Sequence, residues 1–224
     1  MLASYLDSTN LKPDAGEKEI ADLCRQARQL GMAAVCINPF RVPQAVSILS
    51  ASQVKVCTVI GFPLGADRLS TKVYSADQAL RMGAQELDMV INIGAVKDRR
   101  LNMVEKEIKS ILRMKEDRPF LLKVIVETAL LDEKELAVLT RLVSDSGADF
   151  IKTSTGLSSR GVNLRDLEII KQNKSPGLKI KASGGIKSLD FACELLQAGA
   201  DRLGSSNASG LVEEYRKRGG LLRR

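Results

Sequence analysis

Histidine and tryptophan are both absent from the 224 residues of the chain. The lack of histidine excludes Ser-His-Asp and Cys-His catalysis, zinc sites with histidine ligands, and histidine general bases. No CxxC pair occurs, and no acidic cluster has the spacing of a calcium loop, so we expect no metal ion. Any catalysis must therefore rest on lysine, aspartate, glutamate, tyrosine, serine or cysteine. The four cysteines are Cys24, Cys36, Cys57 and Cys193.

Long apolar runs are lacking as well. The longest, residues 32–37, has six residues, whereas a helix that crosses a bilayer needs about 20. No basic start followed by a long apolar stretch is present, so we expect no secretory signal. The sequence therefore predicts a cytoplasmic protein with no membrane partner.

The positive charge is concentrated at the C-terminal end. Lysine and arginine number 34 against 27 acidic residues, and five of these basic residues lie in the last nine positions. We expect one catalytic domain over residues 1–212 and a partly disordered basic tail over residues 213–224. Aromatic residues, at 4%, offer few platforms for stacking bases, so we expect no nucleic-acid partner.

Short runs rich in valine and isoleucine recur along the chain and indicate strands that are buried on both faces. The first run is shorter and weaker than the others. The expected strands are Tyr5–Asp7, Ala33–Ile37, Val54–Ile60, Glu86–Ile91, Phe120–Glu127, Asp149–Thr153, Leu178–Ala182 and Asp201–Gly204.

Amphipathic patterns lie between these runs. Apolar residues at helical spacing, followed by a glycine, predict helices over Glu17–Leu30, Asp132–Val143 and Ser188–Ala198. A Gly-Ala pair followed by an acid or amide opens three strands, at residues 83–85, 147–149 and 199–201. Eight strands with intervening helices and no break in composition predict an α/β protein, a single (β/α)8 TIM barrel, rather than a doubly wound open sheet.

Two lysines stand at the ends of neighbouring expected strands, which is where the reactive groups of such barrels lie. Lys152 interrupts an otherwise apolar strand, and Lys181 ends the next one. Neighbouring parallel strands are about 4.8 Å apart, so the two amines could meet at one mouth of the barrel. Burial and a second cation would both lower the pKa of a lysine, and a neutral amine attacks carbonyls. The alternative is that one or both lysines lie at the surface.

An acid, Asp88, is also set within an apolar strand. A buried carboxylate needs a partner, and the lysines across the barrel would supply one. Its role would be to move protons or to orient a substrate hydroxyl, and the alternative is a structural salt bridge. We expect Lys123 and Glu127, in the following strand, to form supporting ion pairs.

Glycines and small polar residues follow each of the last three expected strands. Barrels of this class often bind phosphate at this corner, through backbone N–H groups and a helix N-terminus. A single glycine pair is more often just a turn, but three such loops converge here. The expected binding residues are Thr155, Gly156, Gly184, Gly185, Gly204, Ser205 and Ser206.

These motifs together are specific. The chain resembles the deoxyribose-phosphate aldolases, a family of class I aldolases, along almost its whole length. The strongest resemblance is carried by FIKTSTG, residues 150–156, together with KASGG, residues 181–185. Further matching stretches are residues 33–39, 59–65, 86–94, 122–128 and 202–206.

The resemblance implies reversible cleavage of 2-deoxy-D-ribose 5-phosphate to D-glyceraldehyde 3-phosphate and acetaldehyde, with no cofactor. It places the Schiff-base lysine at Lys152, the pKa-lowering and proton-handling lysine at Lys181 and the acid at Asp88. It also implies phosphate contacts in the glycine loops, and relatives suggest that a homodimer could form. The partners expected are phosphorylated sugars and small aldehydes.

Three departures from the family pattern and two rival functions stand beside this resemblance. Many members of the family end in a tyrosine, whereas this chain ends Gly-Gly-Leu-Leu-Arg-Arg. Ser8 stands where many relatives have a histidine, and Asn207 stands where a serine or threonine is common. One rival is a phosphate-binding isomerase that uses Asp88 and Lys181 without a covalent intermediate, which would leave Lys152 unexplained. The other is a nucleic-acid-binding protein driven by the basic tail, whose affinity would fall steeply with salt.

Overall fold

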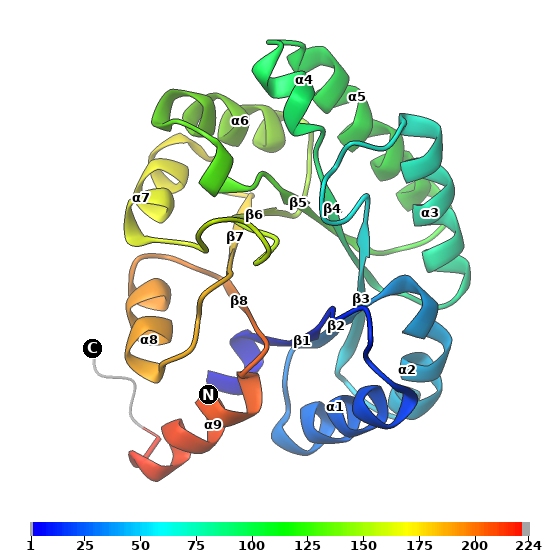
Figure 1. The fold of residues 1–224 in the computed structure, drawn as a ribbon, viewed down its shortest axis with the longest axis vertical. Coiled ribbons are helices and arrows are strands. Elements are labelled where there is room, and N and C mark those ends of the chain that lie inside the picture. Colours follow the sequence, from blue (N-terminus) through cyan, green and yellow to red (C-terminus); the bar gives the residue numbers. More distant parts are fainter. Residues whose placement is uncertain (1, 221–224) are drawn as a thin grey trace.

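In the computed structural model, which describes residues 2–220, eight parallel strands close into a barrel in chain order. Helices form a ring outside the strands (Figure 1). The predicted TIM barrel is therefore confirmed. The strands are β1 (Leu6–Asn10), β2 (Ala34–Ile37), β3 (Lys55–Ile60), β4 (Glu86–Val90), β5 (Leu121–Ile125), β6 (Phe150–Lys152), β7 (Lys179–Ser183) and β8 (Arg202–Ser205).

The helices follow the strands around the barrel. The α-helices of the described residues are α1 (Glu17–Leu30), α2 (Val42–Leu49), α3 (Leu69–Arg81), α4 (Ile93–Lys97), α5 (Leu101–Leu112), α6 (Glu133–Asp145), α7 (Leu164–Asn173), α8 (Leu189–Gln197) and α9 (Ala208–Lys217). Short 3-10 helices cover Leu2–Tyr5, Pro39–Arg41, Arg113–Glu116 and Thr128–Leu130. None of these helices is both long and apolar enough to cross a membrane.

The first strand is where the sequence pattern was weakest, and here the boundaries differ. Tyr5 belongs to a 3-10 helix, and β1 continues to Asn10. Its last three residues are polar, so they carry no apolar signal. They are strand residues because the backbone pairs with β2, where Asn10 lies opposite Ile37.

The repeated Gly-Ala joints have a common structural use. The side chain of the third residue accepts the first free N–H of the neighbouring strand. Gln85 accepts from Val56 at 3.3 Å, and Asp149 accepts from Leu122 at 2.7 Å. Asp201 accepts from Ile180 at 2.8 Å. An acid or amide is required there because the backbone N–H near the start of the neighbouring strand would otherwise lack an acceptor.

Residues of the strands alternate between two environments. Apolar side chains pack in the main hydrophobic core; examples are Leu87, Val124, Ile151 and Ile180. Their chain neighbours are charged and pair with one another inside the barrel; these are Asp88, Lys123, Lys152 and Lys181. The period of two along a strand thus places an ionic cluster within an apolar shell.

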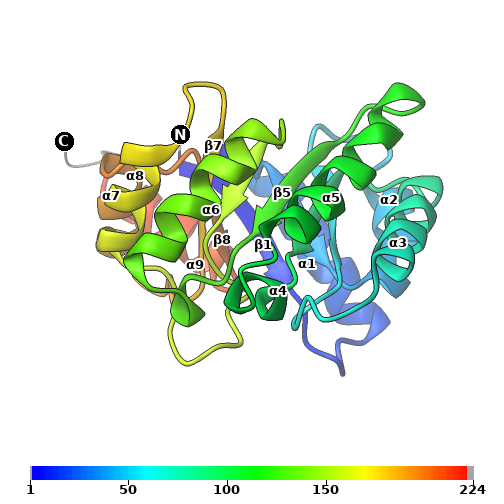
Figure 2. The same ribbon diagram turned by 90° about the horizontal axis from the view of Figure 1, so that it is seen from above.

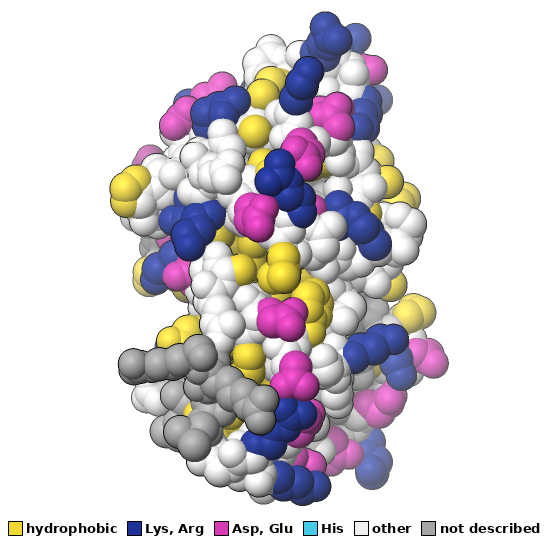
Figure 3. Space-filling model, turned by 90° about the vertical axis from the view of Figure 1, so that its left-hand side faces the viewer, with side chains coloured by type: hydrophobic (Ala, Val, Ile, Leu, Met, Phe, Trp, Pro, Cys, Tyr) yellow, Lys and Arg dark blue, Asp and Glu magenta, His cyan; other side chains and the backbone are white. Residues whose placement is uncertain are grey.

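The loops that follow β1 and β6 project from the same end of the barrel (Figure 2, blue and yellow-green, at the bottom). At the chain end, α9 continues to Lys217, so the expected tail boundary at residue 212 falls inside a helix. Residues 221–224 lie outside the described residues. On the side that carries α7 and α8, positive and negative side chains are interspersed rather than separated into patches (Figure 3).

Candidate active site

Lys152 and Lys181 lie opposite each other in the register of β6 and β7. Both Nζ atoms donate to the same oxygen of Asp88, Oδ2, at 2.7 Å each. All three residues are at most 3% exposed. The structure therefore brings the two lysines together at one carboxylate, which reaches them from β4.

Lys123 holds the other oxygen of this carboxylate. Its Nζ lies 2.8 Å from Asp88 Oδ1 and 2.6 Å from Oε2 of Glu86, so it forms the expected ion pairs. Glu86 in turn pairs with Arg202 at 3.2 Å. Both oxygens of Asp88 thus accept from ammonium groups, which fixes the position of this carboxylate.

Asp7 closes the network between the first and last strands. Its carboxylate pairs with Lys181 and, at 2.8 Å, with Arg202. Four basic side chains thus face three carboxylates inside the barrel. With all seven ionised, one positive charge remains uncompensated. An excess of charge is costly in a buried site.

The pKa values follow from these contacts. Burial raises the pKa of Asp88, but Lys123, Lys152 and Lys181 outweigh burial and hold this pKa well below the usual range. Burial lowers the pKa of Lys181, but Asp7 and Asp88 outweigh it, so the pKa of Lys181 is raised. At Lys181 the two carboxylates that approach it outweigh the repulsion of a neighbouring cation.

A cavity of about 470 Å³ opens at the C-terminal end of the strands. Of the three lysines in the network, Lys152 alone lines it; Lys181 and Asp88 lie beneath. The loop after β1 contributes Lys12, and the loop after β7 contributes Lys187. All the expected binding residues line this cavity: Thr155, Gly156, Gly184, Gly185, Gly204, Ser205 and Ser206.

Two of the glycine loops touch through their backbones. A Cβ added to Gly161, in the loop after β6, would lie 2.0 Å from the carbonyl oxygen of Gly184, in the loop after β7. A Cβ on Gly184 would in turn lie 2.9 Å from the Cα of Gly161. This approach requires glycine at both positions. It draws the two loops together at the cavity wall.

The hydroxyl groups of two expected binding residues are already engaged. Ser205 donates to the carbonyl of Ile186 at 2.8 Å and accepts from the N–H of Asn207 at 3.0 Å. Thr155 donates to Glu127 and accepts from the N–H of Leu157 at 3.1 Å. Glu127 therefore forms a hydrogen bond with Thr155, a residue that lines the cavity, whereas an ion pair was expected for Glu127.

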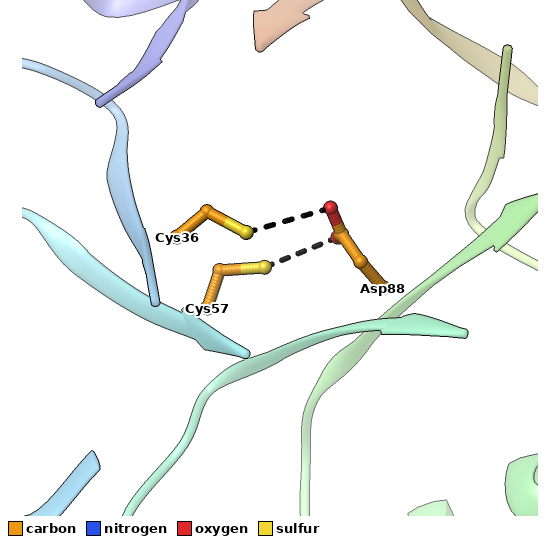
Figure 4. Close-up of side chains that lie close together, drawn as sticks. All are labelled: Cys36, Cys57 and Asp88. Atoms are coloured by element: carbon orange, nitrogen blue, oxygen red, sulfur yellow. Dashed lines mark hydrogen bonds between the residues drawn. The ribbon is translucent and has the colours of Figure 1, made fainter. Parts of the chain in front are cut away.

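Two thiols also point at the central carboxylate (Figure 4). Cys57 Sγ lies 3.1 Å from Asp88 Oδ1, and Cys36 Sγ lies 3.8 Å from Oδ2. These three groups are close enough together to hold a metal ion, but a cation would have to displace the lysines from Asp88. Burial raises the pKa of Cys57 well above its usual value, so this thiol is a hydrogen-bond donor to Asp88.

Several members of the network were missed by the sequence reasoning. Three of them, Asp7, Glu86 and Arg202, share the signal that also marked Asp88, a charged residue inside a run expected to be a strand, whereas the two cysteines carry no such signal. The sequence does not show that β1 pairs with β8 when the barrel closes, which brings residues of the first and last strands together. The missed residues are Asp7, Glu86, Arg202, Cys36 and Cys57.

Comparison with known proteins adds to this geometry. Residues 3–213 match the family described as "DeoC/LacD family aldolase". The chain is similar to a deoxyribose-phosphate aldolase of Aquifex aeolicus, with 46% identity over 96% of each chain. It is similar to the solved structure "QR15, an Aldolase", with 44% identity, a TM-score of 0.92 and 97% of each chain covered. A structure described as a tetrameric deoxyribose phosphate aldolase from Aeropyrum pernix shares 34% identity and a TM-score of 0.90, over 97% of this chain and 92% of that one.

Proposed function

Because the chain belongs to the DeoC/LacD family of aldolases, we propose that it cleaves 2-deoxy-D-ribose 5-phosphate reversibly to D-glyceraldehyde 3-phosphate and acetaldehyde. The reaction proceeds through a Schiff base on Lys152. One observation carries this assignment. Among the three lysines that converge on Asp88, Lys152 is the one whose side chain lines the cavity.

The uncompensated positive charge of the network supports a neutral amine at this position. Loss of the Lys152 proton would leave the cluster balanced. The free Nζ then attacks C1 of the open-chain sugar, and loss of water gives an iminium ion. Asp88 Oδ2, which contacts both Lys152 and Lys181 at 2.7 Å, is the relay through which protons pass between them.

The iminium is the electron sink for bond cleavage. The C3 hydroxyl loses its proton and becomes the aldehyde of glyceraldehyde 3-phosphate as the C2–C3 bond breaks. The electron pair of that bond forms an enamine on Lys152. Protonation at C2, with Lys181 as the proton source, regenerates an iminium, and water releases acetaldehyde and the amine.

The phosphate of the substrate binds at the glycine loops. Gly156, Gly184 and Gly204 line the cavity, and α9 begins just beyond Ser206. A helix N-terminus and glycine-rich backbone favour a bound dianion. The lysines that line the same cavity, Lys12 and Lys187, add positive charge there.

The test is a cleavage assay in which acetaldehyde release from 2-deoxyribose 5-phosphate is followed with an NADH-dependent alcohol dehydrogenase. Lys152→Met is expected to abolish cleavage, and the exposed outer-helix variant Lys171→Met is expected to keep it. Cleavage that survives in Lys152→Met would overturn the assignment. It would favour a reaction without a covalent intermediate.

Two further proposals concern organisation. We propose that the catalytic domain includes α9 and that the basic residues beyond Lys217 take no part in catalysis. We also propose a homodimer in solution, which light scattering after gel filtration would test. A single species at the monomer mass would contradict this second proposal.

A further inference from the structure

Glu127 has an unusual backbone for its residue type. It follows β5 with φ 53° and ψ 71°, the left-handed region that residues other than glycine seldom adopt. Its side chain is almost fully buried, with 3% of the residue exposed. A strained residue of this kind persists where its surroundings fix it, and such residues cluster at functional sites.

The contacts of Glu127 lead to the cavity. Its Oε2 accepts two hydrogen bonds from Thr155, one from the N–H at 3.1 Å and one from the hydroxyl. Within residues 2–220 its Oε1 has no hydrogen-bond partner. Thr155 is therefore the residue to which the buried carboxylate is bound, and Thr155 lines the cavity.

This pairing fixes the direction of the Thr155 hydroxyl. Its single proton goes to Glu127, and one lone pair accepts from the N–H of Leu157 at 3.1 Å. A hydroxyl has one donor and two acceptor sites, so one lone pair remains. In this state Thr155 can accept a hydrogen bond from a ligand, but it cannot donate one to a phosphate.

The loop after β6, which carries Thr155, is also held at Arg160, independently of Glu127. Thr128, next to Glu127, donates to Asp166 at 2.8 Å, and Arg160 binds both the carbonyl of Thr128 and the Asp166 carboxylate. Removal of the Glu127 carboxylate therefore takes away the hydrogen bonds that Thr155 donates to it, while the contacts of Arg160 keep the rest of the loop after β6 in place.

We propose that Glu127 is a positioning residue that holds the Thr155 hydroxyl as an acceptor for a hydroxyl group of the substrate's sugar chain. This inference rests on the proposed function. The open-chain substrate carries hydroxyls on C3 and C4, between the carbon bound to Lys152 and the phosphate. Thr155 follows Lys152 and precedes Gly156 in the chain, and all three line the same cavity, so its hydroxyl lies on the wall along which the sugar chain would extend.

The test compares two reactions of the same variants. Glu127→Met, similar in size but without an acceptor oxygen, is expected to lower kcat/KM for 2-deoxyribose 5-phosphate by about 10- to 100-fold. Borohydride trapping of acetaldehyde on Lys152 is expected to stay within about twofold of the unaltered protein, since acetaldehyde has no hydroxyl. Glu127→Gln keeps an acceptor oxygen and is expected to restore kcat/KM to within about threefold.

A double-mutant cycle separates positioning from a structural role. Adding Glu127→Met to Thr155→Val should cause a much smaller loss than Glu127→Met alone, because the hydroxyl that Glu127 positions is already gone and only the bond from the N–H of residue 155 is left to break. Thr140→Val, which removes a buried threonine hydroxyl in α6, is the matched control and should keep kcat/KM. Glu127→Ser, too short to reach Thr155, replaces Glu127→Met if that variant does not fold.

Three results would overturn the proposal: additive losses in the cycle, an equal loss of acetaldehyde trapping in Glu127→Met, or no loss of cleavage. Absence of the acetaldehyde adduct in the unaltered protein is a different failure. It would overturn the proposed Schiff base itself, and the positioning role with it.

Discussion

Replacing Asp88 with asparagine tests the charge balance of the buried network most sharply. The side chain keeps its shape, but Lys123, Lys152 and Lys181 lose the carboxylate that all three contact. The uncompensated charge inside the barrel rises from one to two. Removing one partner of a buried ion pair typically costs about 3–5 kcal/mol. For a domain of this size that corresponds to a fall in Tm of roughly 6–20 °C.

The free energy of unfolding should also acquire a pH dependence in Asp88→Asn. In the unaltered protein the carboxylates raise the pKa of Lys181 above its unfolded value. That contribution to stability is complete below the unfolded lysine pKa of about 10.4, and it is lost only as the pH rises further. Lys181 therefore adds no slope between pH 7 and 9.5. In Asp88→Asn, burial and repulsion would lower the pKa of a lysine, so the unfolded chain binds more protons in this range. The free energy of unfolding should then increase with pH by up to about 1.4 kcal/mol per unit.

The assay is urea unfolding at several pH values between 7 and 9.5. Asp22→Asn, which removes an exposed acid beside Lys18 and Arg25, is the control and should follow the unaltered protein. Cleavage by Asp88→Asn should fall by at least about 100-fold, the usual effect of a lost proton-transfer group. Parallel stability curves for Asp88→Asn and the unaltered protein would refute the charge argument.

Two other changes probe the rest of the barrel. Lys72→Met breaks a buried pair with Glu107 at 2.9 Å outside the ionic cluster, so it should lower the free energy of unfolding by about 3–5 kcal/mol in urea; a loss under about 1 kcal/mol would contradict that. Gly161→Ala places a methyl group 2.0 Å from the Gly184 carbonyl oxygen. It should raise KM for 2-deoxyribose 5-phosphate about tenfold or more, with less effect on unphosphorylated 2-deoxyribose, and equal effects on both would count against phosphate binding there.

The barrel was predictable because its signals are local. Buried parallel strands need near-continuous apolar runs, and the helix over Glu17–Leu30 has the predicted bounds. The convergence of Lys152, Lys181 and Asp88 was also predictable, because a charged residue in an apolar strand must find a buried partner. The first strand was harder, since Ser8, Thr9 and Asn10 are strand residues by backbone pairing alone.

The electrostatics of the site were not predictable in the same way. The pKa of Lys181 depends on Asp7, which reaches it because β1 closes against β8. Nothing local in the sequence indicates that approach. Thr155 and Ser205 were expected among the binding residues, yet the hydroxyl group of each already has a donor and an acceptor partner. These hydrogen bonds depend on the geometry of the loops, which only the folded chain defines.

The most direct test of the account is borohydride reduction in the presence of acetaldehyde, followed by peptide mass mapping. Hydride reduction of the iminium fixes an ethyl group on the attacking amine. We predict that this group is found on Lys152 and is absent from Lys152→Met. An ethyl group on Lys181 instead, or none on the folded protein, would contradict it.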